Sequence, residues 1–151
     1  MIRIQKEDFD VTTELQNLRR AHPAIGAIAN FVGIVRNSNN GQDVSEMTLE
    51  HYPKMAEQVL EGLQQQALQR WDIIDTVIIH RVGKLIPSDQ IVLVAVASVH
   101  RHDAFAACEF LIDQLKTAGP FWKQERAGDD THWVEERDND KLAAERWQRR
   151  N

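Results

Sequence analysis

Two lysines on either side of a chain break carry the strongest chemical signal in this sequence. Lys116 and Lys123 are separated by Gly119-Pro120 and by an aromatic pair at positions 121–122. Pro120 offers no backbone amide and Gly119 can adopt the left-handed cap conformation, so a helix should end there. The bend predicts that the two ammonium groups converge. Such a pair can bind an anion, or act as a base or nucleophile where burial lowers a lysine pKa. The alternative, two solvated surface lysines, stays open.

Arginine and histidine side chains supply two further candidate anion sites. Arg36 ends the apolar run over residues 24–35, where its guanidinium can offer paired hydrogen bonds to a phosphate or carboxylate. His100 and Arg101 follow a second apolar run, just before a predicted helix start at which backbone amides favour anions. In both places a solvated surface charge is the alternative interpretation.

Several kinds of catalytic centre are excluded by what the sequence lacks. It contains no nucleophile elbow, no phosphate-binding glycine-rich loop and no paired-carboxylate signature. His100 and His102 would share a strand face, but no third ligand has suitable spacing, so no metal site is predicted. The sequence has one cysteine, Cys108, so an internal disulfide is excluded. Cys108 is predicted to be buried in a helix. Any sulfur chemistry therefore needs a reactive group from outside the chain.

Composition and charge describe a globular chain with no signal for nucleic-acid or membrane binding. Of its 151 residues, 42% are hydrophobic and 27% are charged, and the formal net charge is −5. This acidic balance argues against binding nucleic acid by bulk charge. No apolar run approaches the ~20 residues of a membrane span, and the charged N-terminus lacks the apolar core of a signal peptide. We therefore expect a cytoplasmic protein.

Hydrophobic periodicity predicts two long helices between strands that come in hairpin-like pairs. The helices begin at Pro53 and near Asp103, and the second should turn inward Phe105, Cys108, Ile112 and Leu115. Strands are expected over residues 2–5, 24–35, 44–52, 73–82, 91–99, 121–125 and 132–136, with a short helix over 10–19 and a polar turn over 37–43.

This order favours an α+β fold with a mainly antiparallel sheet and both long helices on one face. We expect one catalytic domain over residues 1–137 and a charged tail over 138–151 that is a mobile helix or disordered. His51-Tyr52 and His80-Arg81 are interpreted as structural, the latter as a half-exposed pair on its strand.

Several short blocks occur together and in order along the chain. They are Phe31-Val32-Gly33 with Val35-Arg36-Asn37, Leu49-Glu50-His51-Tyr52-Pro53, His80-Arg81-Val82-Gly83, Ser98-Val99-His100-Arg101, and Leu115-Lys116-Thr117 with Pro120-Phe121-Trp122-Lys123-Gln124-Glu125. In this combination the sequence resembles the large, catalytic subunit of molybdopterin synthase, over roughly residues 26–136.

The resemblance implies a hammerhead-type α+β fold and a homodimer core within a heterotetramer. Each end of that dimer would bind a small ubiquitin-like sulfur-carrier subunit. The carrier's C-terminal Gly-Gly, as a thiocarboxylate, would enter a pocket of this chain. The family adds two sulfurs to cyclic pyranopterin monophosphate, which forms the dithiolene of molybdopterin. No cofactor of its own is implied for the chain, and no nucleic-acid or membrane partner.

The resemblance also implies roles for particular residues. Lys116 matches the family's essential lysine beside the carrier's terminal carboxyl group, and Lys123 matches its second pocket lysine. Residues that match the anion and pterin pocket, or lie in the same binding segment, are Arg36, His100, Arg101, Gln124 and Glu125. Arg36 is a candidate for a residue that the other protomer lends to the pocket.

The sequence departs from the family at two positions. Relatives often carry a basic residue where Gln124 stands, and some have lysine where Ile34 stands. The phosphate contacts of those two positions are therefore not carried over.

Two functions of other classes remain open at this point. The same basic pocket could capture an acidic C-terminal peptide without catalysis. A hydrolase built on a metal held by the histidine pair is the weaker alternative.

Overall fold

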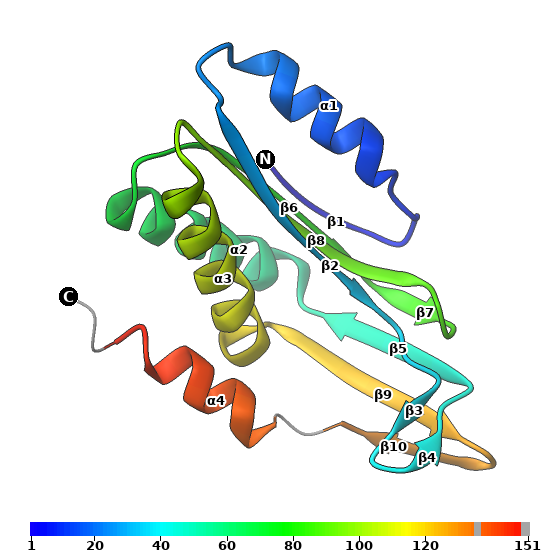
Figure 1. Cartoon of the computed structure of the whole chain (residues 1–151). Helices are drawn as coiled ribbons and strands as arrows, with labels where there is room; N and C mark the ends of the chain where they lie inside the picture. The colour runs from blue at the N-terminus through cyan, green and yellow to red at the C-terminus, as the bar shows by residue number, and fades with distance from the viewer. Residues whose placement is uncertain (135–136, 149–151) are drawn as a thin grey trace.

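The computed structural model describes residues 1–134 and 137–148, and Figure 1 shows the whole chain. The predicted α+β class is confirmed. In chain order the elements are β1 (Ile2–Gln5), α1 (Val11–Ala21), β2 (Ala27–Ile34), β3 (Ser38–Asn39), β4 (Gln42–Asp43), β5 (Glu46–His51), α2 (Pro53–Arg70), β6 (Ile73–Arg81), β7 (Gly83–Leu85), β8 (Gln90–Ser98), α3 (Arg101–Ala118), β9 (Phe121–Ala127), β10 (Asp130–Trp133) and α4 (Asp138–Glu145).

The first sheet has the strand order β1-β6-β8-β2 and lies between helices (Figure 1). Its pairs are antiparallel except for β1, which runs parallel to β6. Side chains of β8 alternate between the two faces, so that Val92, Val94 and Val96 join the core formed with α2 and α3. Leu93, Ala95 and Ala97 join a second cluster that contains Leu18 of α1. The prediction that both long helices share one face is confirmed, and α1 covers the other face.

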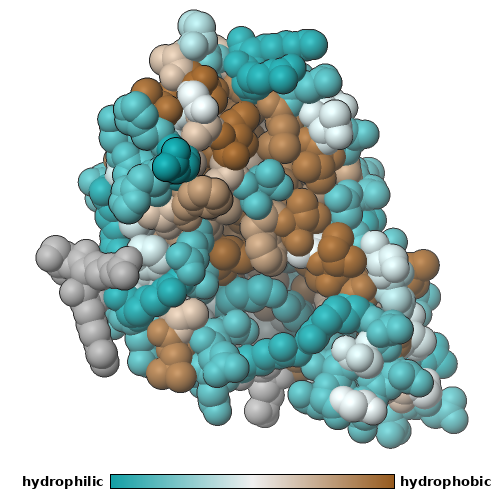
Figure 2. Space-filling model, in the orientation of Figure 1, coloured by the Kyte–Doolittle hydropathy of each residue, from teal (hydrophilic) through white to brown (hydrophobic). Residues whose placement is uncertain are grey.

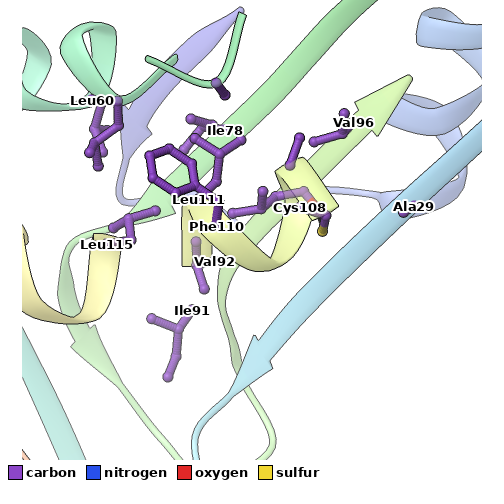
Figure 3. Packing of buried hydrophobic residues seen from close by; sticks show 14 of the residues in the cluster. Ala29, Leu60, Ile78, Ile91, Val92, Val96, Cys108, Phe110, Leu111 and Leu115 are labelled. Atoms are coloured by element: carbon purple, nitrogen blue, oxygen red, sulfur yellow. The ribbon is translucent and has the colours of Figure 1, made fainter. Parts of the chain in front are cut away.

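The main core lies between this sheet and helices α2 and α3. Figure 3 shows Phe110 and Leu111 of α3 beside Leu60 of α2 and Ile78 of β6. Cys108 belongs to the same cluster, as predicted, and burial raises the pKa of its thiol to about 11. A thiol in this state is not a nucleophile at neutral pH.

The second sheet, with the order β10-β9-β5-β7, carries the strand that contains Lys123. Strand β9 runs antiparallel to β5, so that Lys123 lies opposite Leu49 and Glu125 lies opposite Met47. Strand β2 is irregular at its end, where its register against β8 shifts between Gly33 and Ile34.

The predicted polar turn over residues 37–43 is present at Asn40-Gly41 and is closed by a small hairpin of β3 and β4, because Asn40 and Gly41 both adopt positive φ, as two-residue hairpin turns require. A prediction for α3 was wrong. Phe105 does not point inward and is 65% exposed. The buried stripe of α3 begins at Ala104, and one residue further turns a helical side chain by about 100°, away from the sheet.

In the charged C-terminal segment, helix α4 covers Asp138–Glu145 and is followed by a turn over residues 146–148. Helix α4 packs along α3, and Arg146 forms ion pairs with Glu109 and Asp113 of that helix. Trp147 belongs to the main core and is 2% exposed. A separate tail over residues 138–151 stays a prediction, and residues 149–151 lie outside the described part of the chain. In the described ranges, no helix combines the length and the apolar character needed to cross a membrane.

Candidate active site

The bend between the two lysines is built without the predicted left-handed cap. Lys116 lies in the last turn of α3, and Gly119 ends the helix with φ −59° and ψ 126°. This extended conformation is the one that a residue before proline favours, because the Pro120 ring clashes with a helical predecessor. Gly119 is nevertheless required here. A Cβ atom at this position would lie 2.3 Å from the Leu115 carbonyl oxygen.

The two lysines line one cavity of about 540 Å³. Burial is the main cause that lowers the pKa of Lys123 to about 8, and the neighbouring Lys116 ammonium group lowers it further. A lysine with this pKa exists in both protonation states near neutral pH, so it can bind an anion and exchange a proton. The convergence predicted from the sequence is therefore present in the structure.

Further polar side chains surround the lysines in the same cavity. Arg36 lines it from the chain after β2. Glu125 is 5% exposed and accepts a hydrogen bond of 3.0 Å from the Asn39 amide. Arg137 in turn donates to the Asn39 side-chain oxygen over 2.8 Å. The residues of this network, from β9, β3 and the start of α4, form one wall of the cavity, and Asn39 and Arg137 had no signal in the sequence.

Three predicted residues lie away from this cavity. His100 is the N-cap of α3 and Arg101 is its first residue, whereas Lys116 lies in the last turn. At 1.5 Å per residue, Arg101 and Lys116 are about 22 Å apart along the helix axis. Gln124 pairs with Thr48 and Trp133, and since strand side chains alternate, it faces the side of β9 opposite to Lys123.

His80 is a site residue that the sequence did not reveal. The prediction of a half-exposed pair was wrong, because His80 is 5% exposed and lines a second cavity of about 280 Å³ together with Lys116 and Lys123. Burial lowers the pKa of His80 to about 3, and the two lysines add to this effect, so the ring is neutral. Its strand pattern alone gave no signal for this position.

The arrangement offers amines, a guanidinium group and a carboxylate, but no nucleophilic thiol. Within the described residues, no three His, Cys, Asp or Glu side chains are grouped so that they could hold a metal ion. The chemistry that this chain itself provides is anion binding, electrostatic stabilisation and proton transfer.

Replacing Gly119 by alanine should disturb the site through the backbone. Because the new Cβ would press on a backbone oxygen of α3, the turn between the lysines must shift. We expect a loss of about 1–3 kcal/mol in the free energy of unfolding and a clear loss of anion binding. Gly62→Ala is the matched control, since Gly62 lies in α2 with no atom near its Cβ direction. That variant should be stabilised by about 0.5–1 kcal/mol in urea unfolding. Equal changes in the free energy of unfolding of the two variants would contradict this description of the bend.

Comparisons with known proteins agree with this fold and site. The sequence matches the family described as MoaE protein over residues 4–118. It is 56% identical to the molybdopterin synthase catalytic subunit of Ralstonia nicotianae over 146 residues, 97% of this chain and 83% of that relative. Its identity to the subunit of the same name from Pseudomonas aeruginosa is 46% over 147 residues, which cover 97% and 98% of the two chains.

A solved structure gives the same result. The molybdopterin biosynthesis MoaE protein from Burkholderia ambifaria has a TM-score of 0.85 to this chain at 51% identity, and the match covers 98% of this chain and 97% of that one. The resemblance carried by the motifs is confirmed, and the chain belongs to the MoaE protein family.

Proposed function

We propose that this chain is the catalytic subunit of a molybdopterin synthase and that it works in the cytoplasm. It transfers sulfur from a thiocarboxylated small carrier subunit to cyclic pyranopterin monophosphate, which forms the molybdopterin dithiolene. The observation that carries this proposal is the cavity in which Lys116, Lys123 and Arg36 meet. Its positive charge suits both a phosphate and the anionic end of a carrier peptide.

The two lysines have different tasks in this proposal. Lys116 acts on the carrier's terminal thiocarboxylate, either as a base or as a cation that stabilises the developing negative charge. Lys123 grips the substrate, and its lowered pKa lets it exchange a proton near neutral pH. Arg36 binds the phosphate, and Glu125 with the Asn39 amide holds the opposite wall. Gln124 belongs to the same strand segment, but its side chain lies on the other face of β9.

A second copy of the chain would complete the pocket. His100 and Arg101 lie too far from Lys116 to bind the same small substrate within one protomer, so their proposed role in pterin binding requires a homodimer. Figure 2 shows a band of apolar side chains across the face where α3 and β2 lie in Figure 1. Exposed apolar residues of these two elements include Phe31, Ile34 and Phe105. A contiguous apolar band of this kind suits an interface between protomers.

The sulfur must come from a partner subunit. Cys108 is buried and its pKa is raised to about 11, so it supplies no thiolate. A small carrier with a C-terminal Gly-Gly thiocarboxylate meets this need, because its narrow, flexible end can enter a cavity that a folded domain cannot.

Turnover by the reconstituted complex tests the function. The chain, a thiocarboxylated carrier and cyclic pyranopterin monophosphate should together yield a dithiolene and consume the substrate. The matched control is the carrier with an ordinary terminal carboxylate, which should bind the chain and give no product. Carrier binding without consumption of the pyranopterin would instead support a peptide-capture module. Stoichiometric zinc in the active protein would support a metal hydrolase.

A further inference from the structure

Three large aromatic side chains are exposed together beside the second sheet, where they line a cleft of about 280 Å³. They are Tyr52, Trp122 and Trp133, whose exposed fractions are 64%, 41% and 54%. These residues include the one tyrosine of the chain and two of its four tryptophans. Glu50 and His51 complete the lining, and we call the surface formed by these five residues the aromatic cleft. Large aromatic rings gathered on a surface in this way indicate a binding site.

Strand pairing brings these side chains together. Strand β9 lies between β5 and β10 (Figure 1). Trp122 of β9 pairs with Glu50 of β5, and residues directly opposite in an antiparallel pair project from the same face. Trp133 of β10 pairs with Gln124, which makes it the diagonal neighbour of Trp122. The Tyr52 ring meets the Trp122 ring edge-to-face, with 4.9 Å between the ring centroids and an interplanar angle of 82°. One carboxylate and three rings therefore share this face.

The aromatic cleft is separate from the larger cavity that the two lysines line. Side chains alternate along a strand, so Trp122 and Lys123 project from opposite faces of β9. Of the described residues that line the aromatic cleft, Trp122 alone also borders the larger cavity. The proposed sulfur transfer therefore gives no task to Glu50, Tyr52 and Trp133.

The charge of the aromatic cleft favours a cation. The faces of aromatic rings are electron-rich and attract ammonium and guanidinium groups. Glu50 is exposed and forms no ion pair with any residue in the described ranges 1–134 and 137–148. Among the described residues that line the cleft there is no lysine or arginine to oppose a cation. The net charge of −5 adds a general attraction for basic partners.

An arginine side chain suits this cleft better than other cations. Its planar guanidinium can stack on an aromatic ring and donate paired hydrogen bonds to a carboxylate at the same time. Because Glu50 lies directly opposite Trp122, the cleft offers both contacts at one place. A quaternary ammonium group has no hydrogen to donate to Glu50. The volume of about 280 Å³ is also below the range of about 300–1,000 Å³ that is typical of small-molecule sites, which favours a single side chain.

We propose that the aromatic cleft binds an arginine side chain of a partner protein. The guanidinium group stacks on the exposed tryptophan rings and donates hydrogen bonds to the Glu50 carboxylate. This contact goes beyond the proposed sulfur transfer, because it uses the opposite face of β9 and none of the residues assigned to that reaction.

NMR titration of the purified chain with N-acetyl-arginine methylamide tests the site. The indole N–H signals of Trp122 and Trp133 should shift. Those of Trp71 and Trp147 should not, since both rings pack in the main core. One side chain in an open cleft should bind weakly, with a Kd of about 1–10 mM.

Two further probes decide what the cleft recognises. N-acetyl-citrulline methylamide has nearly the same shape and no charge, so it should bind at least about fivefold more weakly. Equal binding of the two amides would show a merely apolar surface and would overturn the proposal. Tighter binding of tetramethylammonium than of the arginine amide would show a site for quaternary ammonium groups, which would also overturn it.

Variants of exposed residues test the two contacts separately. Glu50→Gln keeps the shape and removes the charge, so binding of the arginine amide should weaken about threefold, while binding of the citrulline amide stays unchanged. Trp133→Leu should weaken binding of the arginine amide by a similar factor. Glu61→Gln is the matched control, because Glu61 is an exposed glutamate of α2 outside the cleft, and it should bind like the wild type. Unchanged binding of the arginine amide in both cleft variants would overturn the proposal, whether or not the complex makes a dithiolene.

Discussion

Lys116→Ala should lose turnover by a factor of about 10²–10⁴ while the chain stays folded and still binds the carrier. This range is what a group that moves a proton, or stabilises charge in the transition state, contributes. Lys116 lies in the last turn of α3 and lines the cavity, so its removal leaves the main core unchanged. The measurement is dithiolene formation by the reconstituted complex, with carrier binding followed separately. Full turnover by this variant would contradict the assignment.

The same substitution makes a second, independent prediction. Because the Lys116 charge is one of the causes that lower the pKa of Lys123, its removal should raise that pKa from about 8 toward the ordinary 10.5. Lys84→Ala is the matched control, since Lys84 is an exposed lysine on β7 that pairs with Glu46, and both turnover and the Lys123 pKa should be unchanged.

Lys116→Arg distinguishes the two roles proposed for this residue. Arginine keeps the positive charge but does not release its proton near neutral pH. Partial turnover is expected if Lys116 stabilises an anion, and a loss as large as in Lys116→Ala is expected if it acts as a base. The comparison is made at saturating substrate, so that a difference in binding does not hide the difference in rate.

The part of the site that the sequence predicted depends on local chain geometry. Lys116 and Lys123 could be placed together because a proline ends a helix wherever it occurs, and seven residues with a bend allow two long side chains to meet. Gln124, which the resemblance placed in the same binding segment, instead lies on the opposite face of β9 from Lys123 and Glu125, because side chains alternate along a strand. The bend between the lysines could be predicted because it depends on local sequence alone.

The parts that the sequence did not predict depend on contacts between distant segments. His80 looks like an ordinary strand residue until β9 brings Phe121 against its ring. Arg137 lines the cavity and donates to the side-chain oxygen of Asn39, 98 positions away in the sequence. Gly119 does not take the left-handed cap conformation that glycine favours, because the following proline restricts it to an extended conformation.

The contacts that hold the C-terminal segment in place also could not be predicted from the sequence. Its composition is highly charged, which favoured a mobile tail, yet one side chain anchors it. The Trp147 ring lies 5.5 Å from Trp71 and 5.7 Å from Phe110, both in edge-to-face geometry. Its Nε1 atom donates to Asp113 over 2.7 Å, and Arg70 donates to its backbone oxygen over 3.1 Å. A single aromatic residue in a polar segment gives little periodic signal, so this anchor could not be found from the pattern.

Trp147→Ala should therefore lower the free energy of unfolding by about 3–5 kcal/mol, the range for removing a large buried aromatic side chain. Leu142→Ala is the matched control, because Leu142 is a large apolar residue of α4 that is 63% exposed, and its loss should cost less than about 0.5 kcal/mol. The measurement is urea unfolding, in which the midpoint should fall while the slope stays constant. A mobile tail predicts instead that both substitutions are nearly neutral. Equal, small effects would mean that α4 does not contribute to the core, and that the domain ends near residue 137.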